Sequence, residues 1–202
     1  KKNSLDPKTG LLYHGYDESR QQQWADKTTG RSKNFWGRAM GWYGMGLVDA
    51  LEYFPVNHPK RDELIQILNN FAKAVSKVQD GKTGLWWDIL DMPGKDKNYL
   101  EASASSMFVY TFAKGVRLGY LPKSYLAVAK KGYDGILKTF IKEENGLTNL
   151  SGTVSVSGLG GKPYRDGSFD YYMSEKVVVN DPKGVGAFIQ AANEMEMVPA
   201  LR

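Results

Sequence analysis

The sequence predicts an all-α fold in which inner and outer helices form hairpin pairs. Three observations lead to this prediction: a short segment recurs, small residues open three expected helices, and two further helices are apolar on one side only. Such pairs are typical of an α/α toroid, whose closed form has six of them, and this chain supplies two and a half. We expect residues 1–202 to form a single domain. It would be an open three-unit array or, as the start within a unit favours, the C-terminal half of an (α/α)6 barrel.

A short repeat marks the units. Residues 6–13 (DPKTGLLY) are similar to residues 80–87 (DGKTGLWW), and a weaker copy is expected at 144–148 (ENGLT). A second marker, residues 30–35, is similar to residues 94–99. The spacing gives units of roughly 60–75 residues, a period typical of helical pairs with long loops. Each Gly-Leu segment should be extended, with short β-hairpins in the loops before the inner helices.

Three inner helices are expected at residues 33–53, 99–118 and 182–195. Each opens with small residues, which lower helix propensity but allow close approach of two backbones. We therefore expect these helices to be crowded. The small residues are Gly37, Ala39, Gly41, Gly44 and Gly46 in the first helix, Ala102–Ser106 in the second, and Gly184, Gly186 and Ala187 in the third.

Two outer helices are expected at residues 61–78 and 124–141. Apolar residues recur at helical spacing along one side of each, with charged residues opposite, which predicts one face packed on the core. Ser124 follows Pro122 and is a suitable N-cap. The apolar positions are Leu64, Ile67, Leu68, Phe71, Val75 and Val78, then Tyr125, Val128, Ala129, Ile136, Leu137 and Phe140.

The composition is that of a soluble globular protein, with 42% hydrophobic and 24% charged residues. The net charge of +5 suits acidic ligands, but the lysines are scattered, so neither nucleic acid nor a membrane is an expected partner. No apolar run approaches the roughly 18 residues of a membrane span. With no cysteine, disulfides and thiolate metal sites are excluded.

The segment Phe35–Trp42 is the most distinctive in the chain. It places Trp36, Arg38 and Trp42 at the expected start of an inner helix. Indole rings offer stacking faces, a guanidinium pairs with a carboxylate, and a helix N-terminus adds partial positive charge. This combination indicates a site for a flat anionic ligand. The alternative is that Trp42 is a core residue and Arg38 pairs with a helix carboxylate.

The repeat supports the ligand-binding interpretation. At an offset of 64 residues the scaffold positions match, whereas Trp36 aligns with Leu100, Arg38 with Ala102 and Trp42 with Ser106. Where one copy of a structural repeat has different residues from the other, those residues are candidates for a specific function. Helical spacing also places Arg38, Trp42, Met45 and Asp49 on one helix face.

The two histidines have different expected roles. His14 follows Tyr13 on the extended segment before the first inner helix, at the same end of the array as Trp36, so a structural and a functional role both stay open. His58 lies in an Asn-His-Pro turn at the opposite end, and we interpret it as structural.

No pair of carboxylates stands out as catalytic by spacing. Most are expected to be turn or capping residues, and no metal-ligand cluster is found. The glycine-rich residues 158–163 lack the spacing of a phosphate-binding loop. Together with residues 164–172 they are interpreted as a mobile loop that can close over the mouth of the cavity. The carboxylates considered are Asp17, Glu18, Asp88, Glu101, Asp166 and Asp170.

Four blocks in order resemble glycoside hydrolase family 105, the unsaturated rhamnogalacturonyl hydrolases, which are close to the unsaturated glucuronyl hydrolases of family 88. The resemblance covers essentially the whole chain, and the block around Trp36 is fairly specific. The blocks are residues 10–14 (GLLYH), 35–42 (FWGRAMGW), 101–104 with 115–120 (EASA and GVRLGY), and 180–188 (NDPKGVGAF).

The resemblance implies an (α/α)6 barrel that acts on oligosaccharides left by pectin lyases, with a 4,5-unsaturated uronic acid at the non-reducing end. In this family an aspartic acid protonates C4, water adds at C5, and the hemiketal opens and expels the remaining sugar. No metal and no organic cofactor is implied. Carried over by position, His14, Trp36, Arg38 and Trp42 would contact the substrate.

One departure limits this expectation. No residue here matches the motif of the family's catalytic aspartate, which lies on an earlier helix pair, so the catalytic residue is unknown and this segment alone is expected to be inactive. Two alternatives remain: a non-catalytic carbohydrate-binding helical-repeat protein, and another α/α-barrel polysaccharide enzyme. The linked sugar and the compartment, bacterial cytoplasm or periplasm, stay open.

Overall fold

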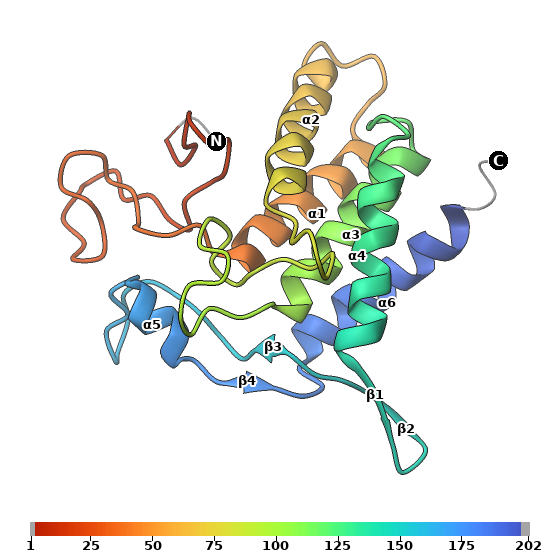
Figure 1. Cartoon of the computed structure of the whole chain (residues 1–202). Coiled ribbons are helices and arrows are strands. Elements are labelled where there is room, and N and C mark those ends of the chain that lie inside the picture. The colour runs from red at the N-terminus through yellow and green to blue at the C-terminus, as the bar shows by residue number, and fades with distance from the viewer. Residues whose placement is uncertain (1–2, 199–202) are drawn as a thin grey trace.

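A computed structural model describes residues 3–198, and it is mostly helical (Figure 1). The order of the helices matches the prediction closely, since each predicted long helix is present with ends shifted by a few residues. No helix in the described part is both long and apolar enough to cross a membrane. The helices are α1 (Gly37–Tyr53), α2 (Arg61–Lys77), α3 (Ala102–Arg117), α4 (Tyr125–Thr139), α5 (Phe169–Ser174) and α6 (Pro182–Met197).

Helix α3 is the centre of the fold. It packs against α1, α4 and α6, while α2 packs on α1 (Figure 1). Every residue from Ala102 to Val116 is buried, as expected for a crowded inner helix. The two outer helices, by contrast, each bury only one side. The predicted contrast between a crowded inner helix and a one-sided outer helix is therefore confirmed for α3 and α4, whereas α1 also buries only one side.

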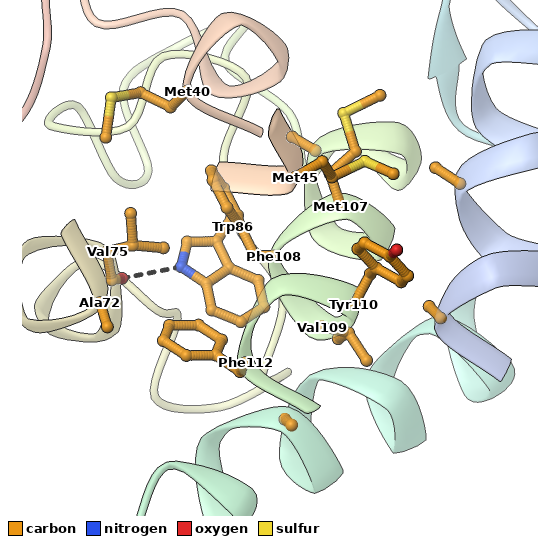
Figure 2. Packing of buried hydrophobic residues seen from close by; sticks show 14 of the residues in the cluster. Met40, Met45, Ala72, Val75, Trp86, Met107, Phe108, Val109, Tyr110 and Phe112 are labelled. Carbon is orange, nitrogen blue, oxygen red and sulfur yellow. Dashed lines mark hydrogen bonds between the residues drawn. The ribbon is translucent and has the colours of Figure 1, made fainter. Parts of the chain in front are cut away.

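Trp86 fills the space between α2 and α3 (Figure 2). Its ring centroid lies 5.3 Å from that of Phe108 and 6.2 Å from that of Phe112. Its buried indole N–H donates to the carbonyl of Val75 at 2.9 Å. The tryptophan of the second repeat segment is thus a core residue with its polar atom satisfied.

The repeat corresponds to a recurring loop structure. In residues 6–11 and in 80–85 the aspartate accepts hydrogen bonds from the amide and hydroxyl of the threonine three positions later. The glycine after that threonine has φ +79° in both loops, a conformation that favours glycine. Residues 26–31 (DKTTGR) form the same loop, which the sequence comparison missed because arginine replaces leucine.

The third copy predicted at residues 144–148 was wrong. There the chain turns between β1 (Ile141–Glu144) and β2 (Leu147–Leu150), which pair antiparallel. Asn145 and Gly146 both have positive φ, 53° and 74°, which is the signature of a tight two-residue hairpin turn. The similarity to the repeat came only from a shared Gly-Leu pair.

The predicted hairpins before the inner helices are only partly present. β3 (Thr153–Val154) and β4 (Val177–Val178) pair antiparallel before α6, with α5 between them. Before α1 and α3 the described chain forms isolated β-bridges instead. Those segments are held by side chains and single bridges, so they do not develop into strands.

Two glycines of α1 give a direct test of the crowding. A Cβ at Gly44 would lie 2.5 Å from Phe71 and 2.9 Å from the Thr111 hydroxyl, whereas a Cβ at Gly46 meets nothing within 4 Å. Gly44→Ala is expected to lower the free energy of unfolding by about 1–3 kcal/mol through overpacking. Gly46→Ala should raise it by about 0.5–1 kcal/mol because alanine favours a helix. Urea unfolding measures both, and equal effects would contradict this packing.

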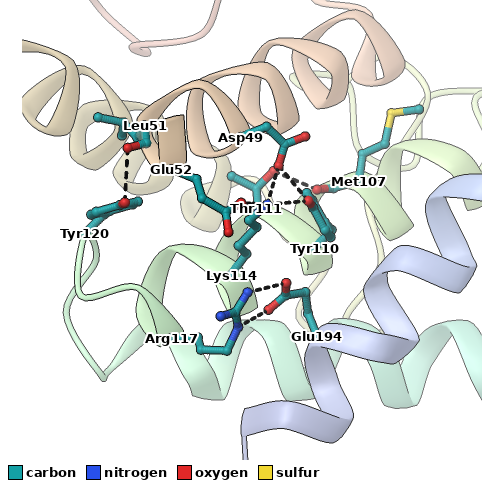
Figure 3. A network of polar contacts seen from close by, with 10 residues as sticks. All are labelled: Asp49, Leu51, Glu52, Met107, Tyr110, Thr111, Lys114, Arg117, Tyr120 and Glu194. Atoms are coloured by element: carbon teal, nitrogen blue, oxygen red, sulfur yellow. Dashed lines mark hydrogen bonds and ion pairs between the residues drawn. The ribbon is translucent and has the colours of Figure 1, made fainter. Parts of the chain in front are cut away.

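A network of charged side chains joins α1, α3 and α6 at the end of the helices away from the loops that precede α1 and α3 (Figure 3). Lys114 pairs with Asp49 and Glu52, at 2.8 Å each. Arg117 makes two hydrogen bonds of 2.7 Å to the carboxylate of Glu194, which is buried. These pairs fix the relative position of the three inner helices.

Candidate functional site

Backbone hydrogen bonds hold the segment that leads into α1. Trp36 forms a β-bridge with Ile89, the amide of Gly37 donates to the carbonyl of Asp88 at 2.7 Å, and Leu90 donates to Phe35 at 3.1 Å. Trp36 is the N-cap residue of α1, with extended backbone angles. Its side chain is therefore placed by a bridge to a distant segment as well as by the helix.

Three rings meet at the start of α1. The ring centroid of His14 lies 4.7 Å from that of Trp36 and 5.9 Å from that of Tyr172, and Trp36 and Tyr172 are 6.3 Å apart. The Nδ1 atom of His14 and the Tyr172 hydroxyl share a hydrogen bond of 2.6 Å. The structure thus confirms that His14 and Trp36 lie together.

The His14–Tyr172 pair is uncharged at neutral pH. Burial lowers the pKa of His14 to about 4, because the charged imidazolium loses its water. Burial also raises the pKa of Tyr172 above its ordinary value, and the charge of Asp88 adds to that effect. The rings therefore offer hydrogen bonds and apolar faces with no net charge.

Arg38 is buried without a carboxylate partner. It is 1% exposed, its Nη2 donates to the carbonyl of Val154 at 2.6 Å, and its guanidinium carbon lies 5.1 Å from the centre of the Trp36 ring. Within residues 3–198 it forms no ion pair, and its Nη1 has no hydrogen-bond partner. The alternative in which Arg38 pairs with a helix carboxylate is therefore not what the structure contains.

Trp42 lies apart from this cluster. Its side chain is 50% exposed and lines a pocket of about 320 Å³ between α1 and α6, which also contains Met45, Asp49 and Lys183. Of the four residues predicted on one helix face, Trp42, Met45 and Asp49 line this pocket, whereas Arg38 is buried and does not line it. The interpretation of Trp42 as a core residue is wrong, because a large part of the ring meets solvent.

Three of the six carboxylates considered, Asp17, Asp166 and Glu101, have the turn and capping roles that were expected. Asp17 and Asp166 accept hydrogen bonds from backbone amides two to five positions later. Glu101 caps α3 by accepting from the amide of Ala104 at 2.6 Å, and its other oxygen accepts from the amide of Val154 at 3.0 Å. Glu101 thereby joins the start of α3 to β3.

Asp88 has a different environment from these three carboxylates. It is fully buried, and its Oδ1 accepts a hydrogen bond of 3.0 Å from the indole N–H of Trp36. Burial raises its pKa to about 8, and the negative charge of Glu101 contributes further. The sequence contained one indication that Asp88 is buried, because this residue directly follows Trp86 and Trp87, two large aromatic residues that are expected to pack in the interior.

The segment interpreted as a mobile loop contributes to the site directly. Residues 164–172 include the start of α5, and Tyr172 from this helix is fully buried against Trp36 and His14. The hydroxyl of Tyr164 accepts from the amide of Trp24, and the side-chain amide of Asn34 donates to the carbonyl of Gly167. These bonds connect the segment to the N-terminal loops.

His58 lies in the turn between α1 and α2, as expected. Its ring contacts Phe54, and its Nδ1 accepts from the amide of Lys60 at 3.1 Å. Within the described residues no group of three or more histidine and acidic side chains is arranged to hold a metal ion.

Comparison with known proteins gives the class of the chain. Residues 1–199 match the family described as Glycosyl Hydrolase Family 88, so the chain belongs to this family. A family 105 glycoside hydrolase from C. acetobutylicum ATCC 824 has a similar structure, with a TM-score of 0.95 and 54% identity over 97% of this chain. The fold described above is therefore also found in a family 105 glycoside hydrolase.

Two curated relatives are also similar. Protein Atu3128 of Agrobacterium fabrum is 41% identical over 192 residues, which cover 92% of this chain and 82% of that protein. Unsaturated rhamnogalacturonyl hydrolase YesR of Bacillus subtilis is 34% identical over 125 residues, or 61% of this chain and 33% of that protein. The chain spans most of the first relative, a third of YesR and 55% of the C. acetobutylicum structure.

Proposed function

We propose that His14, Trp36, Arg38 and Trp42 bind the 4,5-unsaturated uronate at the non-reducing end of a rhamnogalacturonan-type oligosaccharide. The activity is hydrolysis of that sugar by hydration of its enol-ether double bond. The observation that carries this proposal is Arg38, a buried guanidinium that lies against the Trp36 ring and has no carboxylate partner among residues 3–198.

The environment of Arg38 supports an anionic ligand. A buried charge is costly unless it is paired, and a buried N–H without an acceptor adds to that cost. The free Nη1 is a donor that a carboxylate oxygen would satisfy, while Nη2 stays fixed on Val154. A uronate would therefore relieve both costs, whereas the hydroxyl of a neutral sugar could accept the hydrogen bond but could not neutralise the charge.

The rings beside Arg38 support a flattened sugar. A 4,5-unsaturated uronate is half-planar, and an indole face stacks well on such a ring. His14 is uncharged because burial lowers its pKa to about 4, so it offers a neutral hydrogen-bonding edge beside Trp36. Trp42 lies one turn further along α1 than Arg38, and we propose that its exposed ring contacts the same uronate.

The chemistry requires an acid that these residues do not supply. In the proposed reaction an aspartic acid gives its proton to C4, water adds to C5, and the resulting hemiketal opens and releases the remaining saccharide. We place that aspartate upstream, on a helix pair that precedes this sequence. The chain would then form the C-terminal half of an (α/α)6 barrel, as supported by the greater length of the similar family 105 structure.

The test is an assay of turnover on an unsaturated rhamnogalacturonan disaccharide, followed by the loss of absorbance of the conjugated enol ether. We expect no turnover by residues 1–202 alone and turnover by a longer polypeptide that includes preceding helix pairs. Turnover by the 202-residue chain would contradict the upstream acid. Binding without turnover in both forms would favour a carbohydrate-binding protein.

A further inference from the structure

The contact between Asp88 and Trp36 joins two segments that are far apart in the sequence. Asp88 lies in the loop before α3, and Trp36 is the N-cap of α1. The backbone around Asp88 is fixed on both sides, because its amide donates to Tyr99 at 2.8 Å and its carbonyl accepts from Gly37 at 2.7 Å. The carboxyl is therefore held in place before it meets the indole N–H.

We propose that Asp88 is a positioning residue for sugar binding: its buried carboxyl accepts the indole N–H of Trp36 and so holds that ring beside Arg38. This inference rests on the proposed function. It assigns to Asp88 an effect on affinity that acts through two neighbouring side chains, without contact between Asp88 and the sugar.

The hydrogen bond to the indole restricts the orientation of Trp36. The indole N–H has a single donor direction, and Asp88 Oδ1 at 3.0 Å accepts it inside the protein. In this orientation the centre of the Trp36 ring lies 5.1 Å from the Arg38 guanidinium carbon, and its centroid lies 4.7 Å from that of the tilted His14 ring. Without the acceptor, the ring would lose the contact that sets this angle and would carry a buried donor without a partner.

The charge state of Asp88 decides whether it competes with the ligand. Trp36 and Arg38 face it from the start of α1, Tyr99 and Glu101 from the segment before α3, and Tyr172 from α5. Burial and the Glu101 charge raise its pKa to about 8, although the Trp36 hydrogen bond and Arg38 lower it in part. At pH 7 the carboxyl is therefore mostly protonated, and the positive charge of Arg38 is not cancelled.

Above pH 8 the same carboxyl ionises and acts against binding. The new negative charge would attract Arg38 and repel a uronate. Burial keeps the pKa values of Tyr99 and Tyr172 above their ordinary values, and His14 has already lost its proton near pH 4. Because binding requires the protonated form, affinity for the uronate should fall by up to about tenfold for each pH unit above 8.

Two variants separate the two roles. Asp88→Leu removes the acceptor, and we expect about five- to tenfold weaker binding of an unsaturated uronide at pH 7. Asp88→Asn keeps an acceptor for the indole and cannot ionise, so it should recover most of that loss and remove the decrease above pH 8. Asp91→Asn, at an exposed carboxyl three residues further along, is the matched control.

The experiment combines calorimetric binding of the unsaturated uronide between pH 6 and 10 with NMR of the tryptophan indole N–H signals, assigned through Trp36→Phe. The Trp36 signal should titrate near pH 8 in the natural chain and in Asp91→Asn, and should not titrate in Asp88→Asn. The NMR titration needs no ligand, so it reports on Asp88 even if the sugar fails to bind. Thermal unfolding checks that each variant is folded.

Each outcome is decisive. If the natural chain binds no uronide while the Trp36 signal titrates, the proposed function fails and the contact between Asp88 and Trp36 stands. If the uronide binds equally well to a folded Asp88→Leu variant, or the alkaline decrease persists in Asp88→Asn, the positioning role is overturned.

Discussion

Replacing Arg117 with alanine is expected to lower the free energy of unfolding by about 2–4 kcal/mol, a large loss for a single change. Arg117 makes two hydrogen bonds to Glu194, whose side chain is 6% exposed, whereas that of Arg117 is 24% exposed. Its removal would leave a buried carboxylate unpaired between α3 and α6. The partial exposure of Arg117 keeps the loss below that of a fully buried pair.

A double-mutant cycle checks this expectation by urea unfolding. Arg117→Ala combined with Glu194→Leu removes the unpaired charge, so the double variant should be more stable than Arg117→Ala alone. A loss below about 1 kcal/mol for Arg117→Ala would mean that the pair behaves as an ordinary surface ion pair. The contact between α3 and α6 would then owe little of its stability to this ion pair.

Replacing Arg38 with methionine is expected to weaken binding of the unsaturated uronide by about 10- to 150-fold, the equivalent of one lost charged hydrogen bond. Methionine has similar length and fills the buried space without a charge. The methyl ester of the same sugar should bind the variant and the natural chain with similar affinity. Calorimetry with both ligands therefore measures the part of the affinity that depends on the carboxylate.

Arg31 provides the control for this substitution. Its guanidinium carbon lies 5.4 Å from the centre of the Tyr13 ring, so it is also an arginine over an aromatic ring, but it lies outside the proposed cluster. Arg31→Met should leave the preference for the acid over the ester unchanged. If Arg38→Met lowers thermal stability and keeps the same preference, Arg38 is a structural residue.

The helices were predictable because their signals are local. One-sided apolar spacing in residues 61–78 and small residues at the start of α1 and α3 both report on packing within a single element. The loop that begins at Asp26 escaped the comparison for the opposite reason. Its structure depends on aspartate, threonine and glycine alone, so the leucine used as a marker was irrelevant.

The cluster around Trp36 could be predicted only in part. Trp36 and Arg38 stood out because they replace scaffold residues of the repeat, and His14 because it precedes the same helix. Asp88 and Tyr172 were missed because their roles come from contacts 52 residues and 158 residues apart in the sequence. No periodicity reports on such contacts, which depend on a β-bridge and on the placement of α5.

Trp42 shows the limit of the helical argument. Spacing along α1 correctly placed it on one face with Met45 and Asp49, but could not identify what that face would meet. The neighbouring element is α6, which leaves a pocket instead of closing over the ring. The residues that share a helix face are therefore predictable from sequence. The element that packs against that face depends on the tertiary fold.

Binding of a uronate by Arg38 and the rings around it depends on the carboxylate of the sugar, so an acid and its ester should differ in affinity. Calorimetry of the natural chain with an unsaturated rhamnogalacturonan disaccharide and with its methyl ester isolates the carboxylate. We predict that the acid binds at least about tenfold more tightly than the ester, as one charged hydrogen bond requires. Equal affinities, or no binding of the acid to the folded chain, would contradict the account.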